Sequence, residues 1–216
     1  MCSNIGVGLR ERKKQETLRR ISAEAIRLFV ERGFDRVTIA EVAAAADVSV
    51  NTVYNYFPAK EDLVFPGGDA LPDRLADVVR TRPVGESAAG AVLAYLREAL
   101  RSRDREIGLA EGFGRVLAMM LATPALAARL TGLGEQMVRS LAVVLAEETG
   151  AAPDDPLPRL VASQIGWLHS LVYGEVGRRV LAGDRPDDIA ESTVDLLDSV
   201  EWLLGDRIMS YAVRES

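Results

Sequence analysis

The chain has 216 residues, of which 48% are hydrophobic, so it can bury a sizeable core and is not a disordered segment. Its single cysteine, Cys2, excludes a disulfide framework or a cysteine-based zinc site and favours the reducing cytoplasm. The net charge of −6 is unevenly divided, because residues 1–36 carry +4 and residues 37–216 carry −10, so any contact with nucleic acid is expected at the N-terminal end.

The first predicted helix covers about residues 10–32, because the apolar residues between Leu18 and Phe29 recur at helical spacing. Gly33 follows, a residue that tolerates the backbone conformation at which helices end. The charges ahead of this helix follow a short, weakly apolar start, which is the reverse of a secretory signal. No apolar run has the length of a membrane span, so we expect a soluble, cytoplasmic protein with no membrane partner.

Two short helices are predicted next. Thr38 and Glu41 match a capping box, in which each side chain satisfies a free backbone amide of the other, at the start of a helix over 39–45. Asp47 suits a left-handed turn, and Ser49 can cap a further helix that ends at Tyr56. Two short helices joined by a tight turn predict a helix-turn-helix, whose second helix enters the major groove of DNA.

The residues expected on the outer side of this second helix are chemically suited to reading DNA. Asparagine pairs with adenine through two hydrogen bonds, and valine or threonine methyl groups contact the thymine methyl. Hydroxyl and ammonium groups bind phosphates, although tyrosines at such positions also serve as packing residues. The candidate DNA-contacting residues are Thr38, Val50, Asn51, Thr52, Tyr54, Asn55, Tyr56 and Lys60.

Four motifs of this region resemble the DNA-binding domain of the TetR family of transcriptional regulators: Thr38–Ala43, Ala46–Ser49, Thr52–Phe57 and Lys60–Leu63. The resemblance extends over about residues 10–64. It implies that Ser49 and the residues up to Tyr56 form the recognition helix and that Lys60 binds a phosphate. Asp47 stands where the family more often has glycine, a small departure because aspartate tolerates that turn.

A second departure is Pro66-Gly67-Gly68, which interrupts the helix predicted to begin near Lys60. The helical pattern resumes over about residues 71–80. In the family this helix links the ligand-binding domain to the DNA-binding domain, so we expect a hinge or kink here. The predicted domains are residues 1–64, for DNA binding, and residues 65–216, for ligand binding and dimerisation.

The remainder reads as long helices with no alternating strand pattern, so the predicted fold class is all-α: a three-helix N-terminal domain with a helix-turn-helix and a larger helical domain. The helices are expected at about 86–102, 106–122, 124–149, 157–182 and 187–204. The last two carry apolar stripes that either lie in one core or pack against a partner chain. The resemblance implies a homodimer through these two helices, which lets two helix-turn-helices read a palindrome.

A ligand cavity in the larger domain is a further expectation, for a small hydrophobic or amphipathic effector. Each of its candidate residues has an ordinary alternative as a core residue. They are Phe113, Met120, Met137, Gln164, Trp167, His169 and Tyr173. We expect no cofactor and no metal, because His169 is the only histidine and no other ligand cluster accompanies it.

The function expected from these features is a DNA-binding transcriptional regulator, most simply a ligand-responsive repressor of a palindromic operator, with activation as an alternative. An enzyme is disfavoured, because the sequence has no nucleophile elbow, phosphate loop or metalloprotease motif. A helical interaction module that has lost DNA binding is the other alternative, and salt-dependent binding to a palindrome would exclude it.

Overall fold

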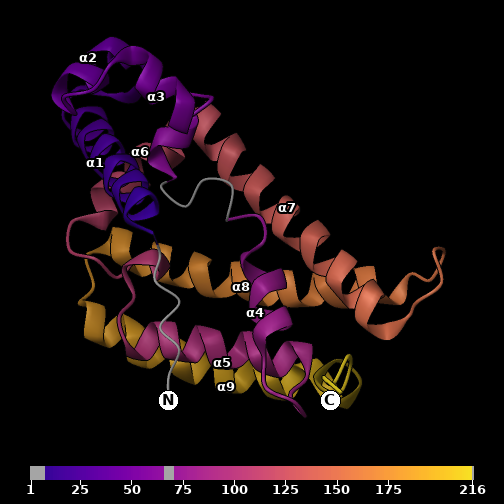
Figure 1. Ribbon diagram of the computed structural model, residues 1–216. Helices are drawn as coiled ribbons and strands as arrows, with labels where there is room; N and C mark the ends of the chain where they lie inside the picture. Colours follow the sequence, from indigo (N-terminus) through magenta and orange to yellow (C-terminus); the bar gives the residue numbers. More distant parts are fainter. Residues whose placement is uncertain (1–7, 66–70, 216) are drawn as a thin grey trace. The chain divides into compact units, whose positions relative to one another are not determined.

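The computed structural model describes residues 8–65 and 71–215, and the regular elements of this part are all helices (Figure 1). The predicted all-α class is therefore confirmed. Contacts divide the described residues into two units. The first contains the residues up to 65 together with Met119–Leu126, and the second contains the rest. The predicted hinge at Pro66-Gly67-Gly68 lies outside the described residues.

The first unit is built on three helices, α1 (Leu9–Arg32), α2 (Ile39–Ala45) and α3 (Val50–Tyr56), shown in indigo and purple in Figure 1. Short 3-10 turns, η1 (Phe34–Arg36) and η2 (Glu61–Val64), follow α1 and α3. All three helices match their predicted bounds within one residue. Their shared core holds Ile21, Ala25, Leu28, Phe29, Val42, Ala43, Val53, Phe57 and Leu63.

The second unit is formed mainly by long helices. Its elements are α4 (Arg74–Thr81), α5 (Ala88–Arg101), η4 (Arg105–Ile107), α6 (Phe113–Ala122), α7 (Pro124–Thr149), α8 (Leu157–Ala182) and α9 (Pro186–Met209). α5 packs against α4, α8 and α9, and α8 also packs against α9.

No single helix of the described chain is long and apolar enough to span a bilayer. α6 and α7 pass that test only together, and they are bent by 100° relative to each other.

The helix predicted over 106–122 is wrong in its first part. η4 ends at Gly108, which has a left-handed φ of 93°, and a second left-handed glycine, Gly112 (φ 79°), precedes α6. Residues with a Cβ are strained at such angles, so these two glycines favour an irregular connection over a continuous helix. Ile107 and Leu109 are both buried in the core of the second unit, so apolar residues occur here without a continuous helix.

Most residues of the apolar stripes predicted on α8 and α9 lie in the core of the second unit. Val161, Ile165 and Leu168 of α8 are buried there, as is Ile189 of α9. Leu203, which has the spacing of the α9 stripe, is exposed instead. Further apolar side chains are exposed outside the stripes: Leu157, Leu160, Trp167, Leu181 and Trp202. α9 is regular up to its predicted end at residue 204, and Gly205 then departs from helical geometry (φ 68°, ψ 163°).

The C-terminal segment is attached to the loop between α4 and α5 through Arg82. The backbone N–H groups of Gly85 and Arg214 donate to the carbonyls of Arg214 and Glu86 at 2.9 and 3.0 Å. The guanidinium of Arg82, 1% exposed, forms two hydrogen bonds to Glu148 at 3.0 and 2.6 Å. It also donates to the Ala212 carbonyl at 2.7 Å, so this buried cation joins α4, α7 and the C-terminal segment.

Candidate DNA-binding and effector sites

The start of α2 and the turn that follows the helix both have the local features that the sequence predicted. The Glu41 amide donates to the Thr38 hydroxyl at 3.2 Å, and the Thr38 amide donates to the Glu41 carboxylate at 2.8 Å. The hydrogen bond from the Thr38 amide is the main reason that the pKa of Glu41 lies below its ordinary value. Asp47 adopts the left-handed conformation (φ 51°) that reverses the chain before α3.

The start of α3 is fixed by Ser49, as expected. Its hydroxyl accepts a hydrogen bond from the Thr52 amide at 3.1 Å, and the two hydroxyls lie 2.8 Å apart. Val53 is fully buried and anchors the middle of the helix, while Phe57 is buried just beyond its end. A seven-residue helix has little stability by itself, so these caps and anchors define its orientation in the unit.

The outer surface of α3 carries the side chains predicted to contact DNA. Asn51 and Asn55 are exposed, and Val50 and Tyr54 are the most exposed apolar residues of the helix, with Tyr54 at 52%. Thr38 and Ser49 are also exposed, whereas Thr52 and Tyr56 are half-buried. α3 contains no charged residue, so any base reading by this surface relies on amide, hydroxyl and methyl groups.

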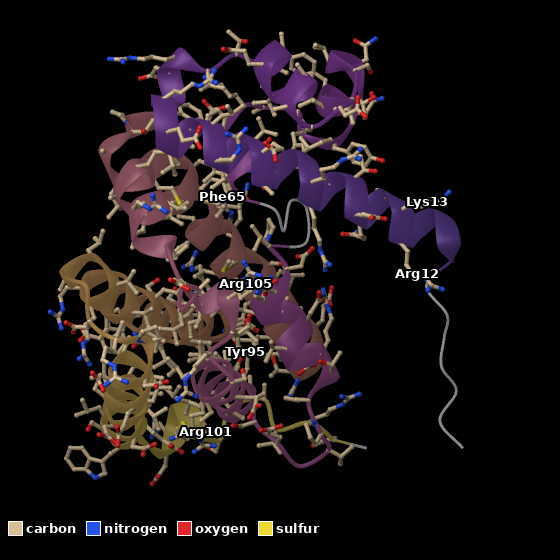
Figure 2. All side chains as sticks on the ribbon, turned by 90° about the vertical axis from the view of Figure 1, so that its left-hand side faces the viewer. Arg12, Lys13, Phe65, Tyr95, Arg101 and Arg105 are labelled. Atoms are coloured by element: carbon tan, nitrogen blue, oxygen red, sulfur yellow. The ribbon has the colours of Figure 1, made fainter. Side chains whose placement is uncertain are left out.

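The charge available for phosphate contacts is small. Residues 1–65 carry ten basic and nine acidic residues, a net charge of +1. The exposed cations are concentrated on α1, where Lys13, Lys14, Arg19 and Arg20 face solvent; Lys13 is labelled in Figure 2. These cations are the candidates for phosphate contacts, and each contact that forms should steepen the dependence of DNA affinity on salt.

Lys60, predicted to bind a phosphate, makes contacts inside the first unit. Its ammonium donates to the Phe34 carbonyl at 2.6 Å and lies 4.4 Å from the centre of the Phe34 ring. The Phe29 ring lies 5.5 Å from the same nitrogen. The side chain thus joins the segment after α3 to the turn that follows α1, a contact that sequence spacing does not indicate.

Lys60→Met should lower the free energy of unfolding of the first unit by about 1–2 kcal/mol, because the methionine keeps the apolar stem but loses the charged hydrogen bond and the cation–π contact. Urea denaturation followed by circular dichroism measures this change. Lys14→Met is the matched control, since Lys14 is an exposed lysine of α1, and it should alter stability by less than about 0.5 kcal/mol. Equal effects of the two substitutions would contradict the assignment.

The predicted effector residues do not form one group. Gln164 is exposed on α8, and Trp167 is 49% exposed among the outer apolar residues of that helix. Met120 belongs to the first unit, and the Phe113 ring lies against Gly108. Met137, His169 and Tyr173 remain, and Met137 and Tyr173 pack against the core of the second unit.

His169 and Tyr173 belong to a polar cluster that also contains Arg74, Tyr95 and Glu106. The imidazole is stacked on the Tyr173 ring at 4.2 Å, and Arg74 donates to the Tyr95 hydroxyl at 3.3 Å and forms an ion pair with Glu106. Burial, with the nearby Arg74 charge, lowers the pKa of His169 to about 4. Sequence reasoning missed Arg74, Tyr95 and Glu106, because they come from α4, α5 and η4 and no local motif connects them.

Burial and the neighbouring hydroxyl of Tyr95 raise the pKa of Tyr173, so its phenol stays protonated at neutral pH. Burial opposes the charge of Arg74, but the hydrogen bonds to Glu106 and Tyr95 outweigh it and raise the pKa of Arg74. At neutral pH His169 and Tyr173 are therefore uncharged hydrogen-bonding groups beside a cation, Arg74, that already has a carboxylate partner.

A separate open cavity of about 790 Å³ lies in the second unit, around the first half of α6 and the α8–α9 connection. Its lining is mostly apolar, with Glu111, Arg115 and Asp184 as the charged residues. Asp184 is already paired with Arg179 at 2.6 Å. The cavity does not include His169 or any other member of the polar cluster.

Comparison with known proteins gives two family-model matches. Residues 21–65 match the model described as bacterial regulatory proteins of the tetR family, and residues 110–166 match the MftR C-terminal domain. The first match contains α2 and α3 and ends at Phe65, the last described residue before the gap at 66–70.

Individual relatives extend over most of the chain. It is 30% identical to the transcriptional regulator TcmR of Streptomyces glaucescens, over 81% of this chain and 76% of that protein. It is also 30% identical to the transcriptional repressor KstR of Rhodococcus jostii (strain RHA1), over 85% of this chain and 84% of that protein. Among solved structures, native NalD of Pseudomonas aeruginosa superposes with a TM-score of 0.52 at 20% identity, over 85% of this chain and 96% of NalD. The chain belongs to the TetR family of bacterial transcriptional regulators.

Proposed function

We propose that this regulator is a cytoplasmic repressor that binds a palindromic operator as a homodimer and is released by a small, mainly apolar effector. The observation that carries the DNA-binding part is the outer surface of α3. Asn51, Tyr54 and Asn55 are exposed there on a helix that is capped by Ser49 and anchored by Val53. The amides and methyl groups of this surface suit base edges in the major groove.

The exposed apolar residues of α8 and α9 support dimerisation. Trp202 is 83% exposed and Leu203 is exposed beside it, while Leu160 and Trp167 lie two turns apart on α8. Large exposed apolar side chains on neighbouring helices are typical of a protein interface. A two-fold dimer would place two copies of α3 on one DNA molecule, which is the arrangement that reads a palindrome.

Release by an effector requires that the effector bind the DNA-bound and DNA-free conformations with different affinities. The polar cluster within an otherwise apolar core of the second unit supports such a site. The name of KstR, a transcriptional repressor, supports repression over activation.

The test is selection of bound sequences from random DNA by the purified protein, followed by affinity measurements over a salt series. An enriched inverted repeat is expected, bound by two copies of the chain per repeat. Asn51→Ala should lower the affinity for the enriched repeat about 5- to 150-fold, because the loss of one good base contact changes DNA affinity by about this factor. Arg101→Ala, an exposed residue of α5 in the second unit (Figure 2), is the control and should leave affinity unchanged.

Three results would contradict the proposal. Failure to enrich any sequence at low salt would contradict the DNA-binding function. Equal affinities of Asn51→Ala and the wild type would show that the outer surface of α3 does not read the bases. Enrichment of a single half-site bound by one chain would remove the dimer. Activation would show itself as increased transcription from a promoter that carries the enriched sequence.

A further inference from the structure

The buried imidazole of His169 has an unsatisfied nitrogen. Its Nε2 atom is inaccessible to solvent, and no hydrogen-bond partner for it exists among the described residues. A buried polar atom without a partner is unfavourable, so a ligand group that supplies the missing hydrogen bond would be favoured. The stacked Tyr173 ring covers one face of the imidazole but gives this nitrogen no hydrogen bond.

The surroundings of His169 define the charge that a ligand group can carry there. The imidazole is neutral at pH 7, since its pKa is lowered to about 4 by burial and by Arg74. The nearby Arg74 charge repels a cation. An anion would have to compete with Glu106, which already pairs with Arg74. An uncharged group is therefore the best match.

The cluster extends to the surface of the second unit. Glu106 is 59% exposed on η4, and the side chain of Arg74 is 19% exposed, so these two residues lie between solvent and the buried Nε2 atom of His169. The segment after η4 has an irregular backbone at Gly108 and Gly112. Tyr95, labelled in Figure 2, lies on α5.

We propose that His169, with the phenol groups of Tyr95 and Tyr173, receives the hydroxyl group of a mainly apolar effector. A hydroxyl both donates and accepts hydrogen bonds, so it matches either neutral tautomer of the imidazole. The buried core residues around the cluster would hold the apolar frame of the molecule. This inference rests on the proposed response to an effector, and it adds the chemical class of the ligand and the residues that recognise it.

The experiment uses three probes of similar shape with the purified full chain: 2-naphthol, which has an uncharged hydroxyl, 2-methylnaphthalene, which has none, and 2-naphthoate, which is an anion. Because His169 is the only histidine, labelling histidine with ¹⁵N gives imidazole signals that belong to this residue alone. We expect 2-naphthol to shift the Nε2 signal and to bind at least 5-fold more tightly than 2-methylnaphthalene, while 2-naphthoate binds weakly.

Two variants separate recognition from packing. His169→Phe should abolish the preference for 2-naphthol over 2-methylnaphthalene, and His169→Gln, which restores a hydrogen-bonding group, should keep part of it. The proposal is overturned if no probe shifts the His169 signal, if the preference survives His169→Phe, or if 2-naphthoate binds most tightly. Operator binding by the ligand-free protein is measured in the same samples, so loss of this proposal is distinguishable from loss of the DNA-binding function.

Discussion

Arg82→Ala should lower the free energy of unfolding of the second unit by about 2–3 kcal/mol, because the hydrogen bonds of a buried guanidinium are lost while the Glu148 carboxylate stays partly in contact with water. The substitution leaves the Glu148 carboxylate without its two hydrogen bonds and the Ala212 carbonyl without its donor. It also removes the side chain that attaches the C-terminal segment to α4. Urea denaturation measures the loss, and hydrogen exchange at the amides of Gly85 and Arg214 should become faster.

Arg80→Ala is the control for this prediction. Arg80 lies in the last turn of α4, two residues before Arg82, but it is exposed, and its ion-pair partner in the described part of the chain is the exposed Asp77. Its removal should cost less than about 0.5 kcal/mol. If Arg82→Ala and Arg80→Ala had the same effect, the buried network around Arg82 would contribute nothing to stability.

His169 should make the protein less stable as the pH falls from about 6.5 to about 4. The pKa of this group in the folded protein is lowered to about 4, against about 6.5 for the unfolded chain, so the unfolded state binds the proton first. The contribution of the neutral imidazole to the free energy of unfolding is therefore fully present above pH 6.5 and decreases as the pH falls. The expected loss is about 1 kcal/mol at pH 5.5 and about 3 kcal/mol at pH 4.

The measurement compares wild type with His169→Phe at pH 7.5 and pH 5.5, both above the sequence pI of about 5.0. The wild type should lose about 1 kcal/mol more than the variant between these two values. Histidine NMR gives the pKa directly, because only one residue contributes the signal. A midpoint near 6.5 would show that the folded protein leaves this imidazole in contact with water.

The first unit was predictable because its determinants are local in the sequence. The capping box at Thr38 and Glu41, the left-handed Asp47 and the Ser49 cap each depend on residues within four positions. The family resemblance could be recognised for the same reason, since these short motifs specify the helix-turn-helix. Lys60 shows the limit of such reasoning, because its partner Phe34 is 26 residues away.

The second unit was less predictable because its decisive contacts join distant helices. Apolar periodicity identified α7, α8 and α9, but it could not distinguish a stripe facing the core from one facing outward, as Trp167 demonstrates. Arg74 and Glu106 would each be read as surface charges from the sequence. Only the packing of α4, α5 and α8 places Arg74 near His169 and Tyr95 beside Tyr173.

The first unit is not a continuous stretch of chain, and this limits how the protein can be recombined. Met119–Leu126, from the end of α6 and the start of α7, clusters with the N-terminal helices, and Leu126 is fully buried. A chimaera that joins residues 1–65 to the sensor domain of another regulator would lack these residues. Exchange of operator specificity between regulators would therefore preserve folding best when the α6–α7 corner is transplanted together with α1–α3.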